Sequence, residues 1–289
     1  MLRKSKIFLE MIKFEHTLFA LPFAFMGAVL GAVVTTDMLP TWQQILWVTL
    51  AMIGARSAAM GLNRVVDAAI DGKNPRTAMR AIPAGFLSKK EVLVFIVASF
   101  VLLFYAASQL NPLCVRLLPI AVFLLTFYSY TKRFTWLCHV VLGLTIGLAP
   151  LGGWIAVTGA FDIAALALYA AVAFWIAGFD ILYACQDVEF DRSQGLHSIP
   201  SKFGVRGALA IAKAFHIVTA AAFIALWGLA DLQWWYAAGL AVAYVILFYE
   251  HMLVKPNDLS KLNTAFFTMN GILSIVVFTF TLVDVLVVR

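Results

Sequence analysis

Charged residues are scarce in this sequence: only 12% of its 289 residues are Asp, Glu, Lys or Arg, whereas 63% are apolar. A soluble globular domain carries about 25% charged residues, so this composition excludes an ordinary soluble protein. Cysteine is scarce as well, and Cys114, Cys138 and Cys185 share no C-x-x-C spacing. The sequence therefore indicates neither a zinc site nor a disulfide framework.

The sequence also lacks the features of a separate soluble part. No low-complexity segment interrupts it, so we expect one domain over residues 1–289. No small-residue cleavage site clearly follows the first apolar run, and we expect that run to be kept as a membrane span. The net charge of +6 could indicate nucleic-acid binding, but basic loops in a membrane protein report topology first. We expect no nucleic-acid partner and infer no obligate protein partner.

Apolar runs of about twenty residues, the length that crosses a bilayer, recur along the chain. They predict an all-α, polytopic membrane protein with nine transmembrane helices in one bundle. The predicted spans are 17–36, 42–61, 91–110, 115–131, 135–158, 163–183, 208–230, 233–254 and 264–287.

Basic residues are concentrated on one side of the predicted membrane. The N-terminus and the loops after the second, fourth, sixth and eighth spans hold most of the 21 Lys and Arg residues. The positive-inside rule makes this side cytoplasmic and places the C-terminus outside. We therefore expect a multi-pass protein of the cell inner membrane.

Two acidic motifs stand out against the scarcity of charge. The first, Asn63-x-x-x-Asp67-x-x-x-Asp71, follows the second span, and the second ends in Asp187-x-x-x-Asp191 after the sixth. Residues four apart share a helix face, where like charges repel unless a cation lies between them. Paired carboxylates are a usual way to hold Mg²⁺ together with substrate phosphates. We therefore expect two Mg²⁺ ions at the cytoplasmic mouth, with these five residues as ligands.

Six basic residues flank the two motifs and suit the binding of a diphosphate. Mg²⁺ together with arginine and lysine stabilises a diphosphate whose negative charge grows as it leaves. The apolar bundle below would hold the rest of the substrate, so a site polar at one end and apolar at the other indicates an isoprenoid diphosphate. The predicted diphosphate-binding residues are Arg76, Arg80, Lys132, Arg133, Arg192 and Lys202.

These motifs resemble those of the UbiA family of intramembrane prenyltransferases. The first motif, with the following Asn74-Pro75-Arg76-Thr77 and Arg80, is similar to the first family motif, and Asp180-x-x-Tyr183-Ala184-x-Gln186-Asp187-x-x-x-Asp191 is similar to the second. Tyr128-Ser129-x-Thr131-Lys132-Arg133 matches a family segment between them. The resemblance covers essentially the whole chain. Arg64 departs from the pattern, because Asp often follows the Asn there.

The resemblance implies an all-helical fold, dependence on Mg²⁺, and transfer of a polyprenyl chain from a polyprenyl diphosphate to a planar acceptor. The nearest branches prenylate 4-hydroxybenzoate for ubiquinone or a dihydroxynaphthoate for menaquinone. We expect an aromatic acid as the acceptor, with 4-hydroxybenzoate favoured.

Arg56 and Asp180 lie two helical turns below Asn63 and Asp187, a depth of about 10 Å. Ionisable residues inside a membrane are functional candidates, although these two could instead pair with each other. We expect Arg56 to bind the acceptor carboxylate and Asp180 to orient its hydroxyl or accept a proton. Tyr183 is best placed to flank a carbocation, so these three residues are the predicted catalytic group.

Two other classes of protein also place aspartates at a membrane. CDP-alcohol phosphotransferases carry an Asp-Gly-x-x-Ala-Arg signature, which the chain's Asp71-Gly72-Lys73-Asn74 does not continue. A divalent-cation transporter needs acids near the bilayer midplane at broken helices, whereas most of these aspartates lie at one surface. We therefore favour prenyl transfer.

Overall fold

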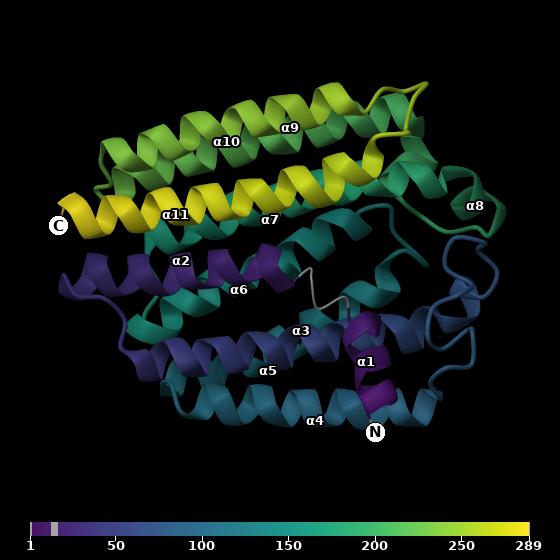
Figure 1. Ribbon diagram of the computed structural model, residues 1–289, viewed down its shortest axis with the longest axis horizontal. Helices are drawn as coiled ribbons and strands as arrows, with labels where there is room; N and C mark the ends of the chain where they lie inside the picture. The colour runs from purple at the N-terminus through teal and green to yellow at the C-terminus, as the bar shows by residue number, and fades with distance from the viewer. Residues whose placement is uncertain (1, 13–16, 289) are drawn as a thin grey trace.

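The computed structural model describes residues 2–12 and 17–288 of the chain. These residues form helices joined by loops, of which residues 72–88 between α3 and α4 are the longest, and the predicted all-α class is confirmed (Figure 1). The helices in chain order are α1 (Leu2–Met11), α2 (Thr17–Thr36), α3 (Trp42–Asp71), α4 (Lys89–Ser108), α5 (Pro112–Thr131), α6 (Cys138–Thr158), α7 (Ile163–Ala184), the 3₁₀ turn η2 (Cys185–Asp187), α8 (Val188–Ser193), α9 (Ile199–Leu229), α10 (Trp234–Leu253), the π-helical turn η3 (Thr264–Met269) and α11 (Asn270–Val288).

Eight helical segments of the described chain are long and apolar enough to cross a membrane. The first predicted span coincides with α2, where the stretch Leu21–Thr36 forms a shorter apolar helix. The predicted total of nine spans thus stays a prediction, while the multi-pass membrane character is established. One difference bears on function: α3 continues to Asp71, beyond the predicted end at residue 61, and carries the first acidic motif on its last turns.

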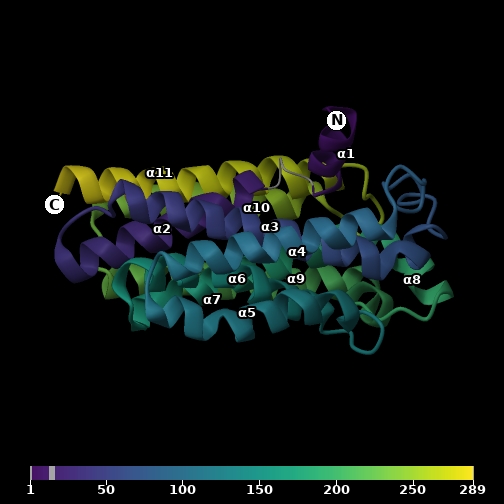
Figure 2. The same ribbon diagram turned by 90° about the horizontal axis from the view of Figure 1, so that it is seen from below.

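The long helices run along a common direction, so the bundle has two distinct ends (Figure 1). The α3–α4 loop and α8 lie at one end, and the C-terminus lies at the other. The short helix α1 lies across the bundle direction near α3 and α4 (Figure 2). The segments that follow the two acidic motifs therefore meet at one end of the molecule.

Side-chain caps define where several helices begin. Thr41 starts α3 with a capping box to Gln44, and Ser88 starts α4 with a capping box to Glu91. In each box the hydroxyl accepts from the backbone of the third residue, whose side chain bonds back to the cap. Ser198 begins α9 in the same way, nine residues before the predicted start of that span, because its hydroxyl accepts from Ser201 N.

Glycines allow α2 and α6 to approach closely. A Cβ atom at Gly153 would lie 2.1 Å from the carbonyl oxygen of Ala24, and one at Gly27 would lie 2.0 Å from that of Pro150. Small residues at a helix crossing let the backbones touch, which is how membrane helices pack without a hydrophobic driving force. This contact fixes α2 against the helix that lines one side of the cavity described below.

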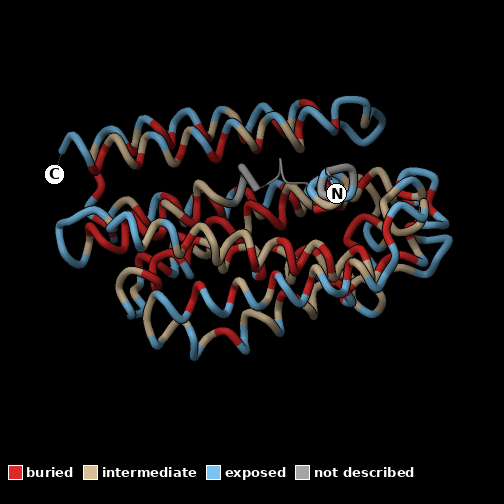
Figure 3. The backbone as a smooth tube through the Cα atoms, turned by 60° about the horizontal axis from the view of Figure 1, so that its bottom comes forward, coloured by how far each residue is buried: buried red, intermediate tan, exposed pale blue. Residues whose placement is uncertain are grey.

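Buried residues line the inner faces of the helices, and exposed residues face outward (Figure 3). The largest buried cluster includes Phe23, Trp154, Trp175 and Phe223. Many outward-facing side chains are also apolar, such as Val97, which suits a surface in contact with lipid.

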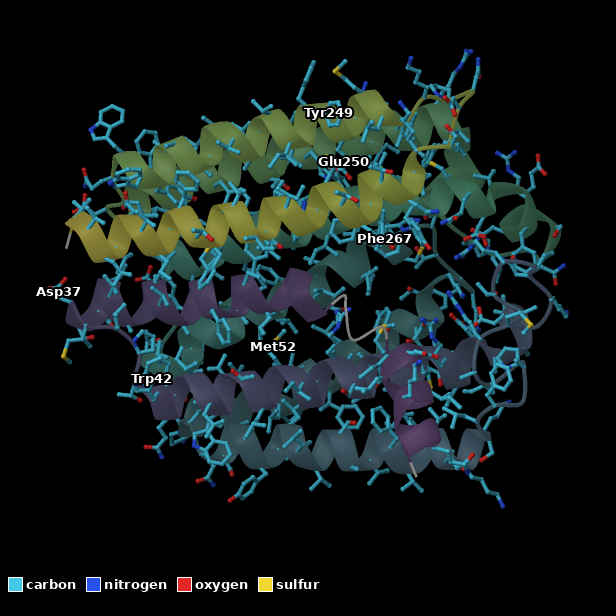
Figure 4. All side chains as sticks on the ribbon, viewed as in Figure 1. Asp37, Trp42, Met52, Tyr249, Glu250 and Phe267 are labelled. Atoms are coloured by element: carbon cyan, nitrogen blue, oxygen red, sulfur yellow. The ribbon has the colours of Figure 1, made fainter. Side chains whose placement is uncertain are left out.

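A buried polar network joins the C-terminal helices. Asn270 Nδ2 donates to Glu250 Oε1 over 2.9 Å, and Trp175 Nε1 donates to Asn270 Oδ1 over 2.7 Å. Glu250 lies between α10 and α11 (Figure 4). The amide of Asn270 also donates to the carbonyls of Ala265 and Phe266, so it fixes the π-helical turn at the start of α11. These bonds connect α7, α10 and α11.

Candidate active site

The first acidic motif lies on the last turns of α3, and its aspartates are buried. Asp67 is held from three sides: by the amide of Asn63 at 3.1 Å, by Lys132 Nζ at 2.6 Å and by Arg133 Nη2 at 3.0 Å. Arg133 also donates to the carbonyl of Val66. Since Lys132 and Arg133 follow α5, the basic pair and the acidic motif come together from separate helices.

Asp71, the last residue of α3, is paired with Arg80. The Arg80 Nη1 group lies 2.8 Å and 2.9 Å from the two carboxylate oxygens of Asp71. The hydroxyl of Thr77 donates to the backbone carbonyl of the same aspartate over 3.0 Å. These bonds hold the α3–α4 loop against the motif that it follows.

The second motif does not lie on one continuous helix. The sequence predicted an unbroken stripe from Asp180 to Asp191, but α7 ends at Ala184 and the 3₁₀ turn η2 precedes α8. The side chain of Gln186 donates to the carbonyl of Tyr183 over 2.8 Å within this tighter turn. A 3₁₀ turn changes the angular step between residues, so the regular helical spacing from Asp180 to Asp187 and Asp191 does not continue across it.

Asp187 links the second motif to the loop after the first. Arg76 binds it in a bidentate manner, with nitrogen–oxygen distances of 3.0 Å and 2.6 Å, and the amide of Asn74 donates to it over 3.1 Å. Arg76 also lies 5.5 Å from the ring centroid of Tyr183. Burial alone lowers the pKa of Arg76, but the hydrogen bonds and charge of Asp187 outweigh burial and raise it above its ordinary value. The guanidinium therefore stays charged at any physiological pH.

Asp191 accepts a hydrogen bond of 2.9 Å from Ser198, and its titratable neighbours are Asp187, Lys132 and His139. Two of the predicted diphosphate-binding residues lie elsewhere. Arg192 donates to the carbonyl of Ser201, and Lys202 lies 4.3 Å from the ring centroid of Trp136. Neither forms an ion pair with an aspartate of the described chain.

The predicted metal ligands offer the donor type that Mg²⁺ prefers, but they are not gathered around one point. Within residues 2–12 and 17–288, no three His, Cys, Asp or Glu side chains form a group that could hold a metal ion. Asp67, Asp71 and Asp187 are instead paired with arginine or lysine. Carboxylate and amide oxygens fit Mg²⁺, which binds through few protein ligands and keeps waters and substrate phosphates as the rest. The donor set therefore fits the ion once these ion pairs open.

Arg64, which departs from the family pattern, has a structural role. It is buried, its Nε donates to the carbonyl of Met11 over 3.4 Å, and its Nη1 donates to Asn63 Oδ1 over 3.3 Å. Arg64 thus ties the end of α1 to the first motif and turns the amide nitrogen of Asn63 toward Asp67.

An apolar cavity of about 440 Å³ lies between α3, α5 and α6, deeper in the bundle than the ion pairs. Arg56 is the charged residue among its lining side chains, and its Nε is buried without a hydrogen-bond partner among the described atoms. Tyr128 also lines the cavity and donates to the carbonyl of Ala59. Met52, another lining residue, lies in the middle of the bundle between α2 and α3 (Figure 4).

Asp180 is paired with His139 on α6 and not with Arg56. The distance from His139 Nδ1 to Asp180 Oδ2 is 2.7 Å, so the alternative pairing of the two intramembrane charges is wrong. Sequence analysis missed His139. A histidine at the start of a predicted span is a polar group at membrane depth, and that signal could have marked it.

The fold and the site together define an integral membrane protein with acidic and basic side chains interlocked at one end, above an apolar cavity. Residues 20–272 match the UbiA prenyltransferase family. The chain therefore belongs to this family and is a membrane-embedded polyprenyltransferase.

Similar proteins of known name agree with this assignment. The chain is 32% identical over 218 residues to a 4-hydroxybenzoate octaprenyltransferase of Methylobacillus flagellatus, covering 74% of this chain and 72% of the relative. It is 29% identical over 254 residues to the enzyme of that name from Saccharophagus degradans, covering 88% and 84%. The structure of a UbiA homolog from Aeropyrum pernix K1 superimposes with a TM-score of 0.84 at 32% identity, over 93% and 98% of the two chains.

A more distant structure shares the fold. The UbiA homolog from Archaeoglobus fulgidus bound to DMAPP and Mg²⁺ superimposes with a TM-score of 0.74 at 21% identity, over 97% and 99% of the two chains.

Proposed function

We propose that this protein transfers a polyprenyl chain from a polyprenyl diphosphate to the ring of 4-hydroxybenzoate, with Mg²⁺ as the cofactor. The observation that carries the proposal is the position of the ion-paired cluster above an apolar cavity that is lined by Arg56, whose Nε has no hydrogen-bond partner in the described part of the chain. The named function of the bacterial relatives supports the choice of acceptor.

The ion-paired acidic and basic residues form the proposed diphosphate site. Four basic residues each form an ion pair with an aspartate: Arg76, Arg80, Lys132 and Arg133. In the substrate complex the aspartates and the basic residues would each have a new partner. The aspartates and Asn63 would hold Mg²⁺, and the four cations would turn to the phosphate oxygens. When bound, Mg²⁺ neutralises the charge that develops on the leaving diphosphate. The contacts of Arg192 and Lys202 give them no role in this proposal.

The apolar part of the substrate would occupy the cavity between α3, α5 and α6. Arg56 supplies a charged donor at the wall of that cavity, and its Nε is buried without a hydrogen-bond partner among the described atoms, which favours a carboxylate ligand. We assign it to the carboxylate of the acceptor. Tyr183 lies beside Arg76, so its ring would face the prenyl carbon as the diphosphate departs. Asp180 lies on the acceptor side of the site.

The proposed reaction is an electrophilic aromatic substitution. Because the cations stabilise the departing diphosphate, allyl-cation character develops on the prenyl carbon and the ring attacks it. We further propose that the ion-paired end of the bundle faces the cytoplasm in the inner membrane, since the basic loops lie there. The product would serve ubiquinone synthesis.

The test is an assay of the purified protein in lipid nanodiscs with Mg²⁺ and a labelled prenyl diphosphate. A panel of acceptors contains 4-hydroxybenzoate, a dihydroxynaphthoate and phenol. We expect one diphosphate released for each prenylated 4-hydroxybenzoate formed. Preferred prenylation of the dihydroxynaphthoate would overturn the acceptor, and diphosphate release without a prenylated ring would overturn the transferase assignment.

A further inference from the structure

His139 and Asp180 form a polar pair between two neighbouring helices. The pair joins α6 to α7 through a hydrogen bond of 2.7 Å between Nδ1 and Oδ2. A carboxylate can only accept, so Nδ1 carries the proton of this bond and Nε2 has a free lone pair in the neutral imidazole. His139 Nε2 is buried and has no hydrogen-bond partner among the described atoms. A buried polar atom without a partner is rare and needs an explanation.

His139 lies on α6 one helical turn before the first cavity-lining residue of that helix, Leu142. Leu142 and Ile146 follow it by three and seven residues on α6, and both line the cavity. Residues with this spacing share one helix face. Arg56 lines the same cavity from α3. An aromatic acid with its carboxylate on Arg56 would therefore present its ring to the helix face that carries His139.

We propose that His139 is the catalytic base that removes the ring proton of the acceptor, and that Asp180 is its positioning residue. This inference rests on the proposed function. The bond between the prenyl carbon and oxygen breaks, and its electron pair leaves with the diphosphate. An electron pair of the ring then forms the new carbon–carbon bond. Finally the carbon–hydrogen bond breaks, its electrons restore the aromatic ring, and the proton passes to His139 Nε2.

The pair is built for this transfer, whereas its neighbours are not. Asp180 fixes the tautomer of His139 and lies beside the positive charge that the imidazole acquires. The side chain of Asp180 is 25% exposed, whereas that of His139 is 5% exposed. Arg56 is a guanidinium and cannot accept a proton. The aspartates of the two motifs are held by basic residues or Ser198 without substrate, and in the proposed substrate complex they would hold Mg²⁺.

The test compares wild type with His139→Gln, using 4-hydroxybenzoate that carries deuterium at the two ring positions next to the hydroxyl-bearing carbon. Glutamine can still hydrogen-bond Asp180 but cannot accept the proton. We expect kcat to fall about a hundredfold, within the usual range for loss of a general base, with KM for the prenyl diphosphate unchanged. Proton removal then limits the rate, so the variant shows a primary isotope effect larger than that of wild type. His197→Gln, in the exposed loop before α9, is the matched control and leaves both quantities unchanged.

Each other outcome overturns the assignment of the base. A His139→Gln variant with normal kcat, or one with lower kcat and an unchanged isotope effect, shows that His139 takes no proton. An increase in KM for the acceptor alone shows a binding role. If the glutamine variant does not fold, Asp180→Asn is the second test, because it removes the negative charge beside His139 and no longer fixes its tautomer. An isotope effect like that of wild type in this variant then rejects the role of the pair. Failure of wild type to prenylate any aromatic acid would instead reject the proposed function.

Discussion

The charged residues of the site have two possible sets of partners. Lys132, for example, lies 2.6 Å from Asp67 and would contact a phosphate once a metal ion takes that aspartate. Such an exchange keeps every buried charge compensated before and after the substrate binds, and an uncompensated buried charge is costly. The substrate-free ion pairs and the substrate complex are thus alternatives that compete for the same carboxylates.

Because of this competition, a substitution at Arg76 should change the affinity for a metal ion and the affinity for the prenyl diphosphate in opposite directions. Arg76→Gln removes the bidentate partner of Asp187 and leaves that carboxylate available to a cation. We expect tighter binding of Mn²⁺, as a stand-in for Mg²⁺, by the substrate-free variant. We also expect about 10- to 100-fold weaker binding of a non-hydrolysable prenyl diphosphate, because loss of a charge-assisted hydrogen bond costs about 1.5–3 kcal/mol.

Titration calorimetry measures both affinities. Arg206→Gln, an exposed arginine on α9, is the matched control and leaves both affinities unchanged. Weaker metal binding by the Arg76 variant would contradict the exchange of partners.

The position of Arg56 leads to a prediction about which acceptor the enzyme prefers. If its guanidinium binds the acceptor carboxylate, wild type prefers 4-hydroxybenzoate to phenol, and Arg56→Met loses this preference. The variant should lose about 10- to 100-fold in kcat/KM for 4-hydroxybenzoate, equivalent to one or two charge-assisted hydrogen bonds, and little for phenol. Steady-state assays with both acceptors measure the change. An equal loss of kcat/KM for both acceptors would show that Arg56 does not bind the acceptor carboxylate.

At the residue scale, the sequence predicted the composition of the site better than its pairings. Both motifs and the nearby cations Arg76, Arg80, Lys132 and Arg133 follow from local spacing and charge. Which cation pairs with which aspartate depends mainly on contacts between distant parts of the chain, such as the 111 residues that separate Arg76 from Asp187, and periodicity contains no such information. The same holds for His139, whose partner lies on another helix.

Helices α6 and α2 illustrate how an element constrains the site. Gly153 faces Ala24 of α2, whereas its neighbour Gly152 lines the cavity and has open space around its Cβ position. An alanine in a helix is favoured over glycine by about 0.5–1 kcal/mol, so the two positions should respond with opposite signs.

We expect Gly153→Ala to lower the thermal midpoint by several degrees, since its Cβ would lie 2.1 Å from a backbone oxygen and force α2 away. Gly152→Ala should keep or slightly raise the midpoint. Differential scanning fluorimetry in detergent compares the two variants. Equal stability of both would show that α2 and α6 do not depend on this contact.

The limits of sequence analysis are also visible in single elements. Apolar runs located the spans, because a membrane helix must satisfy its backbone internally and show lipid an apolar surface. The 3₁₀ turn at Cys185–Asp187 and the π-helical turn at Thr264–Met269 were not predicted. Both turns depend on side-chain bonds, from Gln186 and Asn270, that no hydrophobic pattern reveals.

The whole molecule is asymmetric along the bundle direction, and this predicts its orientation. Lys73 lies in the loop beside the site, and Asp162 caps α7 at the opposite end. In a background without the native cysteines, we expect a cysteine at position 162 to react with an impermeant thiol reagent from outside intact cells. A cysteine at position 73 should react only after the membrane is opened. Labelling at position 73 from outside would contradict both the topology and delivery of the diphosphate from the cytoplasm.

The central claim is that two acidic motifs, far apart in the chain, form one Mg²⁺-dependent diphosphate site. Its most direct test is the rate of prenyl transfer against Mg²⁺ concentration for wild type, Asp67→Asn and Asp191→Asn, since each substitution removes one ligand charge from one motif at nearly constant size. The account predicts that both variants lose at least about a hundredfold in rate, in line with loss of electrostatic stabilisation of a leaving group, and that a chelator abolishes the rest. Full turnover by either variant in the absence of Mg²⁺ would contradict it.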